Sequence, residues 1–408
     1  MKRICQKVLI ILIAFCCVSA PSLSEDLPSI EEQIMRLAPN GCVILNDEHG
    51  NELFSYNSEA VLIPASIIKI LTSLVTLEIL GKEYRFKTEF FLDKHQNFGI
   101  KGWGDPFLIS EEISLITDTL LLKNLRQINR VYLDNSSFSS DLEIPGTSNS
   151  SNPYDALNGA LVVNFNTIDA GKDKHGKIFS GEAVTPLTPL AIQKTRFLKP
   201  GDQQRINLTD RPEESLQYVG ELFSVFLKNS GISIQNNTIS QTIVDDSWTL
   251  LYTHYSTKSL ESAVTGMLEY SNNFIANQIF LIVGAEEKGF PATLDKSRLV
   301  FKEHLRRKWS FEEKKVQLDE ASGISKRNRI TGKTMMTILE KFRVHSNLLK
   351  LKRGIRLKSG TLTGVYNYAG YFMTEKGLRP FVIMTQQKKN NRDKILSLLK
   401  NIDSIKKE

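Results

Sequence analysis

Three short polar elements follow one another along this chain, and their order constrains its fold and chemistry more than any one of them does. In order, they are Ser66-Ile67-Ile68-Lys69, Ser271-Asn272-Asn273 and Lys358-Ser359-Gly360-Thr361. The Ser-x-x-Lys spacing also occurs at Ser397 and Ser404, and Ser-x-Asn also occurs at Ser55 and Ser150, whereas Lys-Ser-Gly occurs once. No single match is specific, so the order and the local context carry the prediction.

The first element lies at the start of a predicted helix over residues 66–80. Pro64 comes just before this segment and Gly81 just after it, as is typical of helix ends. Apolar residues lie on nearly all sides of the predicted helix, and a helix that is apolar on all sides is buried. Lys69 is therefore expected inside or at the edge of a core, where a charge is costly unless it is paired.

Ser66 and Lys69 suit acyl transfer, which needs a nucleophile, a base, an oxyanion hole and a substrate clamp. The two side chains share one face of the helix, because residues three apart are neighbours there. Burial and a nearby like charge, which Lys358 would supply, lower the pKa of a lysine and allow it to act as a base. Taken alone, the pair is equally compatible with a helix cap beside a surface-reaching lysine, and the two later elements favour catalysis.

The second element interrupts a strongly helical segment, residues 260–283. Ser271 is placed to relay a proton between Lys69 and the leaving group, and Asn273 to orient Lys69 and bind a substrate carbonyl. Without Ser66, a polar break between two helices would be the better interpretation.

The third element predicts a strand that binds substrate. Lys358 is a natural partner for a carboxylate, and Gly360 allows a substrate backbone to approach because it has no side chain. The N–H of Thr361 would complete the oxyanion hole, and the alternative is an ordinary edge strand. The predicted catalytic residues are Ser66, Lys69, Ser271, Asn273 and Lys358, and the predicted substrate-binding residues are Lys358, Ser359, Gly360 and Thr361.

Composition limits the other classes of function. The chain has 408 residues, 41% hydrophobic and 24% charged, which describes a soluble protein of two or more domains. Its formal net charge of +7 is too mild to indicate nucleic-acid binding. The six histidines are scattered without metal-ligand spacing, so we predict neither a metal nor a cofactor.

The N-terminus predicts export. Lys2, Arg3 and Lys7 precede an apolar run at residues 8–18, and Ser19 and Ala20 follow it. This pattern is typical of a cleaved signal peptide over residues 1–20, and the run is too short for the alternative of a membrane anchor, which needs about 20 apolar residues. After this leader only Cys42 remains, so no internal disulfide forms, and we predict a periplasmic protein.

The remaining pattern predicts an α+β chain with an insertion. A hairpin (42–46 and 52–56), three strands (355–361, 367–373 and 380–386) and a helix (393–404) close into one antiparallel sheet flanked by helices. Residues 25–86 and 251–408 would form this domain, and the apolar face of the last helix is expected to cover the sheet, the alternative being a membrane-surface helix. Residues 87–250 would be an inserted β-rich region that shapes access without doing chemistry, with strands at 87–92, 131–134 and 160–165 and a helix at 215–229.

These elements resemble a known family, the class C low-molecular-mass penicillin-binding proteins, which are D-alanyl-D-alanine carboxypeptidases and endopeptidases. The resemblance covers most of the chain after the leader. Besides the three elements, with Pro64-Ala65 before the first and Tyr270 before the second, it rests on Gly102-Trp103-Gly104-Asp105-Pro106, Val163-Asn164-Phe165-Asn166, and Ala321-Ser322-Gly323-Ile324-Ser325 with Asn328-Arg329. Two departures are Glu320, where the family usually has Asp, and Ser359, where Thr is commoner.

The resemblance implies the fold of serine β-lactamases and transpeptidases for the outer domain. It also implies peptidoglycan peptides as substrates and β-lactam antibiotics as covalent inhibitors that acylate Ser66. Two other classes stay open: a β-lactamase-like hydrolase, and a non-catalytic wall-binding protein with the same fold. Against the first, the motifs lie far apart and no Glu-x-x-Leu-Asn segment is present, and against the second, every catalytic position is filled.

Overall fold

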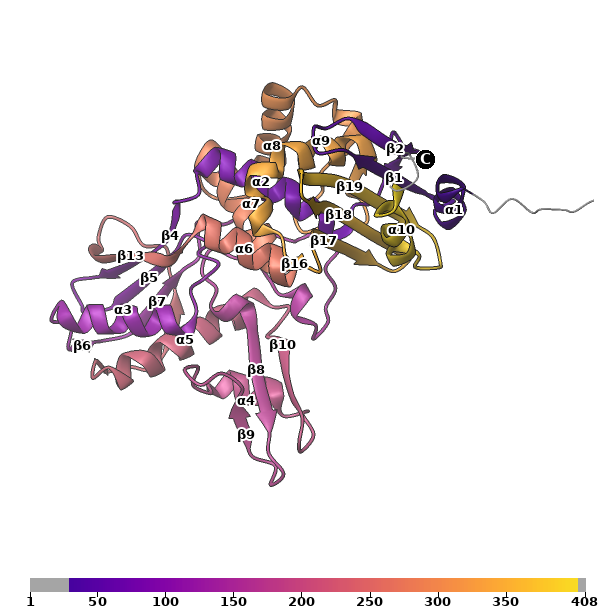
Figure 1. The fold of residues 1–408 in the computed structure, drawn as a ribbon. Helices are drawn as coiled ribbons and strands as arrows, with labels where there is room; N and C mark the ends of the chain where they lie inside the picture. Colours follow the sequence, from indigo (N-terminus) through magenta and orange to yellow (C-terminus); the bar gives the residue numbers. More distant parts are fainter. Residues whose placement is uncertain (1–28, 403–408) are drawn as a thin grey trace, which may run out of the picture.

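The structure is a computed structural model that describes residues 29–402. The predicted leader, residues 1–20, and the Ser-x-x-Lys match at Ser404 lie outside the described residues. The described chain forms one large part that contains both ends, and a middle segment with two larger sheets and one two-stranded sheet (Figure 1). Among residues 29–402, no helix is both long and apolar enough to cross a membrane.

The large part is built on a six-stranded antiparallel sheet in which both ends of the described chain meet. Its order is β16-β17-β18-β19-β1-β2, so the N-terminal hairpin joins the C-terminal strands through β1 and β19. The predicted hairpin and the three predicted strands are therefore confirmed. The strands are β1 (Gly41–Asn46), β2 (Glu52–Tyr56), β16 (Leu351–Lys352), β17 (Ile355–Leu362), β18 (Val365–Thr374) and β19 (Gly377–Gln386).

Helices cover both faces of this sheet, which explains why β1 is buried at every position. On one face, Val43, Phe381 and Ile383 pack with α1 (Ile30–Leu37) and α10 (Arg392–Leu399). The apolar side of α10 thus covers the sheet, as expected. On the other face, α9 (Gly332–Phe342) packs on the sheet. It shares one hydrophobic core with α2 (Lys69–Leu80), α6 (Leu260–Tyr270), α7 (Asn273–Lys288) and α8 (Leu294–Trp309). Beside them lies a small sheet of β14 (Val316–Gln317), β15 (Arg329–Thr331) and β3 (Val61–Leu62).

The second sheet starts directly after α2 and has its own core. Its order is β12-β7-β5-β4-β13, and β13 crosses the domain boundary expected at residue 250. Its strands are β4 (Arg85–Leu92), β5 (Phe98–Gly102), β7 (Val131–Asp134), β12 (Ile239–Gln241) and β13 (Thr249–Ser259), and it packs with α3 (Ser110–Leu122) and α5 (Pro212–Asn229). The predicted helix over 215–229 is therefore confirmed within α5. Nearby, β6 (Gln127–Ile128) pairs with β11 (Ser233–Ile234).

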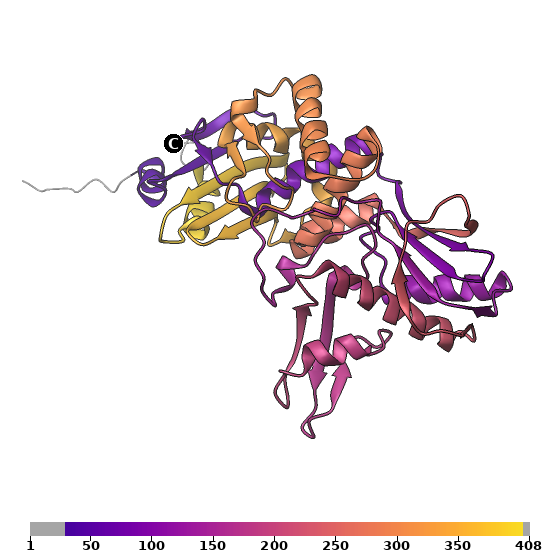
Figure 2. The same cartoon turned by 180° about the vertical axis from the view of Figure 1, so that it is seen from behind.

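A third sheet projects away from the rest of the molecule, as both views show (Figures 1 and 2). It consists of β10 (Gln203–Asn207), β8 (Thr167–Lys172) and β9 (Ile178–Ser180), and α4 (Pro189–Thr195) lies beside it. The middle segment therefore contains two sheets of three or more strands.

The prediction of a strand over residues 160–165 is wrong. This segment is a buried loop that ends in a short 3-10 helix, Asn164–Asn166. Three consecutive residues there, Asn164, Phe165 and Asn166, have positive φ angles, which no strand can contain. Side chains hold this backbone, because Asn164 Oδ1 accepts from the Ser110 N–H at 2.9 Å.

Candidate active site

Ser66 lies in a 3-10 turn, Ala65–Ile68, that leads directly into α2. The residue before it, Ala65, has φ of +47°, an uncommon conformation for a residue with a side chain. The two residues before Ala65 are held by one side chain. The carbonyl oxygens of Ile63 and Pro64 accept hydrogen bonds from Asn367 Nδ2 at 2.9 and 2.8 Å. The strained backbone that presents Ser66 is thus held by a side chain of β18.

Lys69 is completely buried and contacts three groups. Its Nζ lies 3.1 Å from Ser66 Oγ, 2.8 Å from Asn273 Oδ1 and 2.5 Å from the Ser322 carbonyl oxygen. Burial lowers the pKa of Lys69 well below its usual value, and the positive charge of Lys358 lowers it further. A neutral amine has two hydrogens, and the Asn273 and Ser322 oxygens can only accept. The lone pair is then left for the Ser66 hydroxyl, which is the arrangement of a general base.

The loop that supplies the Ser322 carbonyl is organised by one fully buried carboxylate, Glu320. Its two oxygens accept six hydrogen bonds in all. The donors are Asn277 Nδ2, Ser322 N, Ser322 Oγ, Gly323 N, Ser325 N and Asn328 Nδ2. Glu320 therefore fixes the carbonyl group that faces Lys69, and its negative charge opposes the lowering of the Lys69 pKa.

The second and third sequence elements meet each other at the site. Ser271 ends α6 in a left-handed conformation, and its Oγ lies 2.7 Å from Lys358 Nζ. Lys358, on β17, also donates to the Ser359 carbonyl at 3.0 Å. Burial lowers the pKa of Lys358 to about 8. Ser271 can accept from Lys358 while its own O–H points elsewhere, which suits a proton relay.

The substrate-binding strand has a free edge. β16 pairs with β17 only at Arg356 and Ile355, and Leu357 N donates to the Lys350 carbonyl, so within the described chain the β17 edge from residue 358 onward is unpaired. Gly360 lies against the start of the 3-10 turn, where a Cβ would be 2.7 Å from the Pro64 carbonyl oxygen and 3.1 Å from Ser66 N. An extended peptide can therefore add to this edge with its backbone next to Ser66.

All eight residues predicted from the sequence thus gather at one site. Ser66, Lys69 and Asn273 are in direct contact, as are Ser271 and Lys358, while Ser359, Gly360 and Thr361 belong to the free edge of β17. No group of three or more His, Cys, Asp or Glu side chains that would hold a metal occurs among residues 29–402.

Several residues at the site had no predicted role. Glu320 and Ser322 lie in a segment that the family resemblance had marked, but nothing in its pattern showed that its carbonyl faces Lys69. Asn367 is fully buried in a mostly apolar and aromatic strand. An amide in such a segment of the sequence could have indicated a structural or functional role. Tyr154 belongs to the middle segment, yet its carbonyl oxygen accepts from Asn273 Nδ2 at 3.3 Å.

A serine, a buried lysine and a Lys-Ser-Gly strand on a helix-flanked antiparallel sheet define the penicillin-recognising class of acyl-transfer sites. Residues 23–197 and 198–355 match the D-Ala-D-Ala carboxypeptidase 3 (S13) family. The chain belongs to this family.

Individual relatives agree with this assignment. A D-alanyl-D-alanine carboxypeptidase from an Actinomadura species is 22% identical over 436 residues, which cover 89% of this chain and 80% of that protein. The crystal structure of penicillin binding protein 4 from Haemophilus influenzae matches with a TM-score of 0.75 at 19% identity, over 93% of this chain and 99% of that one. A penicillin G-acylated predatory endopeptidase from Bdellovibrio bacteriovorus, in complex with an immunity protein, matches with a TM-score of 0.52 at 15% identity, over 90% and 91%.

Proposed function

We propose that this chain is a serine-type D-Ala-D-Ala carboxypeptidase and endopeptidase that cleaves peptidoglycan peptides through an acyl-enzyme on Ser66. The observation that carries the proposal is the set of contacts around Lys69. Two obligate acceptors, Asn273 Oδ1 and the Ser322 carbonyl, take the hydrogens of the neutral amine and direct its lone pair to Ser66. A serine that only capped the helix, beside a lysine that reached the surface, would not need these two acceptors.

The reaction follows from these positions. Lys69 takes the hydroxyl proton while Ser66 Oγ bonds to the substrate carbonyl carbon, and the resulting oxyanion lies between the N–H groups of Ser66 and Thr361. The C–N bond then breaks as Ser271 passes a proton to the leaving amine. A water molecule next attacks the ester, Ser66 regains its proton and the shortened peptide leaves. Lys358 binds the carboxylate of the leaving D-Ala.

β-Lactam antibiotics are the expected covalent inhibitors, because their ring presents the same kind of acyl group next to a carboxylate. The structural relative from Bdellovibrio bacteriovorus carries penicillin G as an acyl group, which supports this expectation. The penicilloyl ester on Ser66 should be long-lived, since the opened ring stays tethered and obstructs water.

A periplasmic location is part of the same proposal. It is supported by the predicted signal peptide over residues 1–20 and by the presence of only one cysteine, Cys42, after it. Peptidoglycan lies in that compartment, so the location and the substrate agree with each other.

Intact-mass spectrometry with benzylpenicillin tests the proposed function. The unaltered chain should gain one penicilloyl group that persists for many minutes, and Ser66→Ala should gain none and lose about 10⁴-fold or more of its peptidase turnover. Digestion of purified peptidoglycan should release D-Ala or cleaved cross-links. Rapid, repeated penicillin hydrolysis would favour a β-lactamase, and a lack of both adduct and digestion would favour a non-catalytic wall-binding protein.

A further inference from the structure

Arg392 reaches the substrate-binding strand from the opposite side of the sheet to Lys358. It is the first residue of α10, and its guanidinium lies over the Tyr368 ring at 4.5 Å. Its Nη1 lies 2.7 Å from Thr361 Oγ1 and 3.3 Å from the Gly360 carbonyl oxygen. Arg392 is therefore bound to the two residues of β17 that follow Lys358 and Ser359.

Arg392 forms no ion pair within the described chain. The neighbouring carboxylate, Asp393, accepts instead from the Tyr368 hydroxyl at 2.9 Å, and Arg392 forms no ion pair within 4.0 Å among residues 29–402. Lys358 also has no carboxylate partner there, since its bonds go to Ser271 and the Ser359 carbonyl. Two cations thus contact the same strand from its two sides, and neither forms an ion pair within the described chain.

The contact with Arg392 also orients the Thr361 hydroxyl. A guanidinium can only donate, so Thr361 Oγ1 accepts from it, and the hydroxyl hydrogen of Thr361 points away from Arg392. Thr361 is exposed at the free edge. Its hydroxyl therefore presents a donor, polarised by a nearby positive charge, to whatever lies along the edge.

We propose that Arg392 is a specificity-determining residue that selects acyl donors with a free carboxylate next to the scissile bond. This inference rests on the proposed function. With the scissile carbonyl at the N–H of Thr361, the carboxylate of the leaving group lies about one residue further and within reach of the Thr361 hydroxyl. Arg392 supplies a charge that arginine keeps at every working pH, whereas Lys358 is buried and shares its amine with two other oxygens.

A purely structural role for Arg392, as a link between α10 and β17, makes a different prediction. Loss of a link would slow every substrate in proportion, whether or not it carries a carboxylate. Loss of the selecting charge would slow only the carboxylate form. A pair of probes that differ in this one group therefore separates the two roles.

The test compares the acylation of Ser66 by benzylpenicillin with acylation by its methyl ester, followed by mass spectrometry in the full chain. In Arg392→Gln, the ratio of the two rate constants should fall about tenfold, the effect of one charge-assisted interaction of about 1.4 kcal/mol. The ester rate should stay within about twofold. Arg392→Lys, which keeps the charge, should recover part of the ratio. Because each ratio is taken on one protein sample, partial unfolding of a variant cancels.

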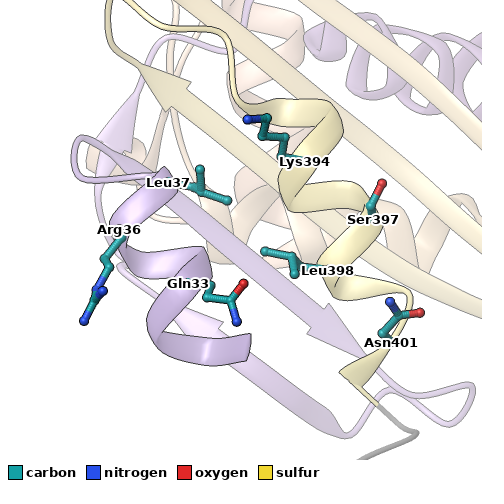
Figure 3. Close-up of a pocket in the computed structure, with 7 residues that line it drawn as sticks. All are labelled: Gln33, Arg36, Leu37, Lys394, Ser397, Leu398 and Asn401. Carbon is teal, nitrogen blue, oxygen red and sulfur yellow. The ribbon is translucent and has the colours of Figure 1, made fainter. Parts of the chain in front are cut away.

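Lys394 provides the matched control. It is an exposed lysine of the same helix, and it faces a hollow between α1 and α10 together with Arg36 and Leu398 (Figure 3). Lys394→Gln removes the same charge and should leave the ratio unchanged.

An unchanged ratio in Arg392→Gln, or an equal fall in Lys394→Gln, would overturn the role of Arg392 alone. If the unaltered chain formed no adduct with either probe, the proposed function would fail, and this inference with it.

Discussion

Gly323 lies so close to Ala65 that a Cβ atom at position 323 would be 2.0 Å from the Ala65 carbonyl oxygen. Gly323 has φ of +85°, and Ala65 also has a positive φ. The contact joins the loop that faces Lys69 through Ser322 to the residue that immediately precedes Ser66. The positions of the nucleophile and of its base therefore depend on the same close approach of two backbone segments.

Gly323→Ala should separate these two segments. We expect the free energy of unfolding to fall by about 1–3 kcal/mol from backbone strain. Penicillin acylation should fall about 10²-fold, the usual effect of a displacement of about 1 Å at a reacting centre. Gly176→Ala is the control, because Gly176 has φ of +84° but no atom within 4 Å of its would-be Cβ. That variant should be similarly strained and fully active, and equal acylation by both variants would contradict the account.

Glu320→Gln tests the buried carboxylate. Each of its oxygens accepts three donors, so an amide group would face donors in either orientation, and we expect a loss of about 1.5–3 kcal/mol of stability. The negative charge of Glu320 raises the pKa of Lys69, so its removal should lower that pKa further. The rise of the acylation rate with pH, which follows the loss of the Lys69 proton, should then occur at lower pH. Glu313→Gln, at an exposed ion pair with Lys302, should change neither quantity. If the rise of the rate with pH did not move in Glu320→Gln, the charge of Glu320 would not control the pKa of Lys69.

The pH dependence of acylation should be bell-shaped. The rate rises with pH as Lys69, whose pKa is lowered by burial and by Lys358, loses its proton and becomes a base. It falls again as Lys358, with a pKa of about 8, loses the charge that binds the carboxylate. In Lys358→Arg the alkaline limb should disappear from this range, because a guanidinium keeps its proton. An alkaline limb near pH 8 in that variant would assign it to another group.

Much of this site could be predicted from the sequence because its chemistry lies in short local patterns. Ser66 and Lys69 are one helical turn apart, and the Lys358 strand alternates as strands do, so their types and order predict both element and role. The main sheet was predictable for a similar reason, since β1 and β19 are short apolar runs and turn residues separate its strands. Residues whose role follows from a short local pattern can be recognised without knowledge of contacts between distant parts of the chain.

The rest depends on contacts that no periodicity reveals. The positive φ of Ala65 is maintained by Asn367 and Gly323, which are far away in the chain. The apolar run at residues 160–163 has the composition of a strand, but tertiary hydrogen bonds to Asn164 and Asn166 hold the following residues in left-handed conformations. The participation of the middle segment at the site was missed because Tyr154 contributes only its backbone carbonyl, and a backbone group has no signature in a sequence.

The contact of the middle segment with α7 gives the last prediction. Asn158 Nδ2 donates to the Phe274 carbonyl at 2.9 Å and to Gln278 Oε1 at 2.8 Å, so it supports the first turns of the helix that begins with Asn273. Asn158→Ala leaves two acceptors without this donor, and we expect a loss of about 1–3 kcal/mol of stability. Because Asn273 orients Lys69, penicillin acylation should also slow, by about tenfold if the barrier rises by about 1.4 kcal/mol.

The control for this variant is Asn237→Ala. Asn237 also belongs to the middle segment, but it is exposed and accepts only from Lys228, at 2.7 Å, so its loss should change neither stability nor acylation. Thermal unfolding and the penicillin acylation rate measure the two effects separately. If Asn158→Ala were less stable but acylated at the unaltered rate, the middle segment would support the fold without positioning Asn273. If acylation slows in the folded protein, the inserted region takes part in arranging the catalytic residues as well as in controlling access to them.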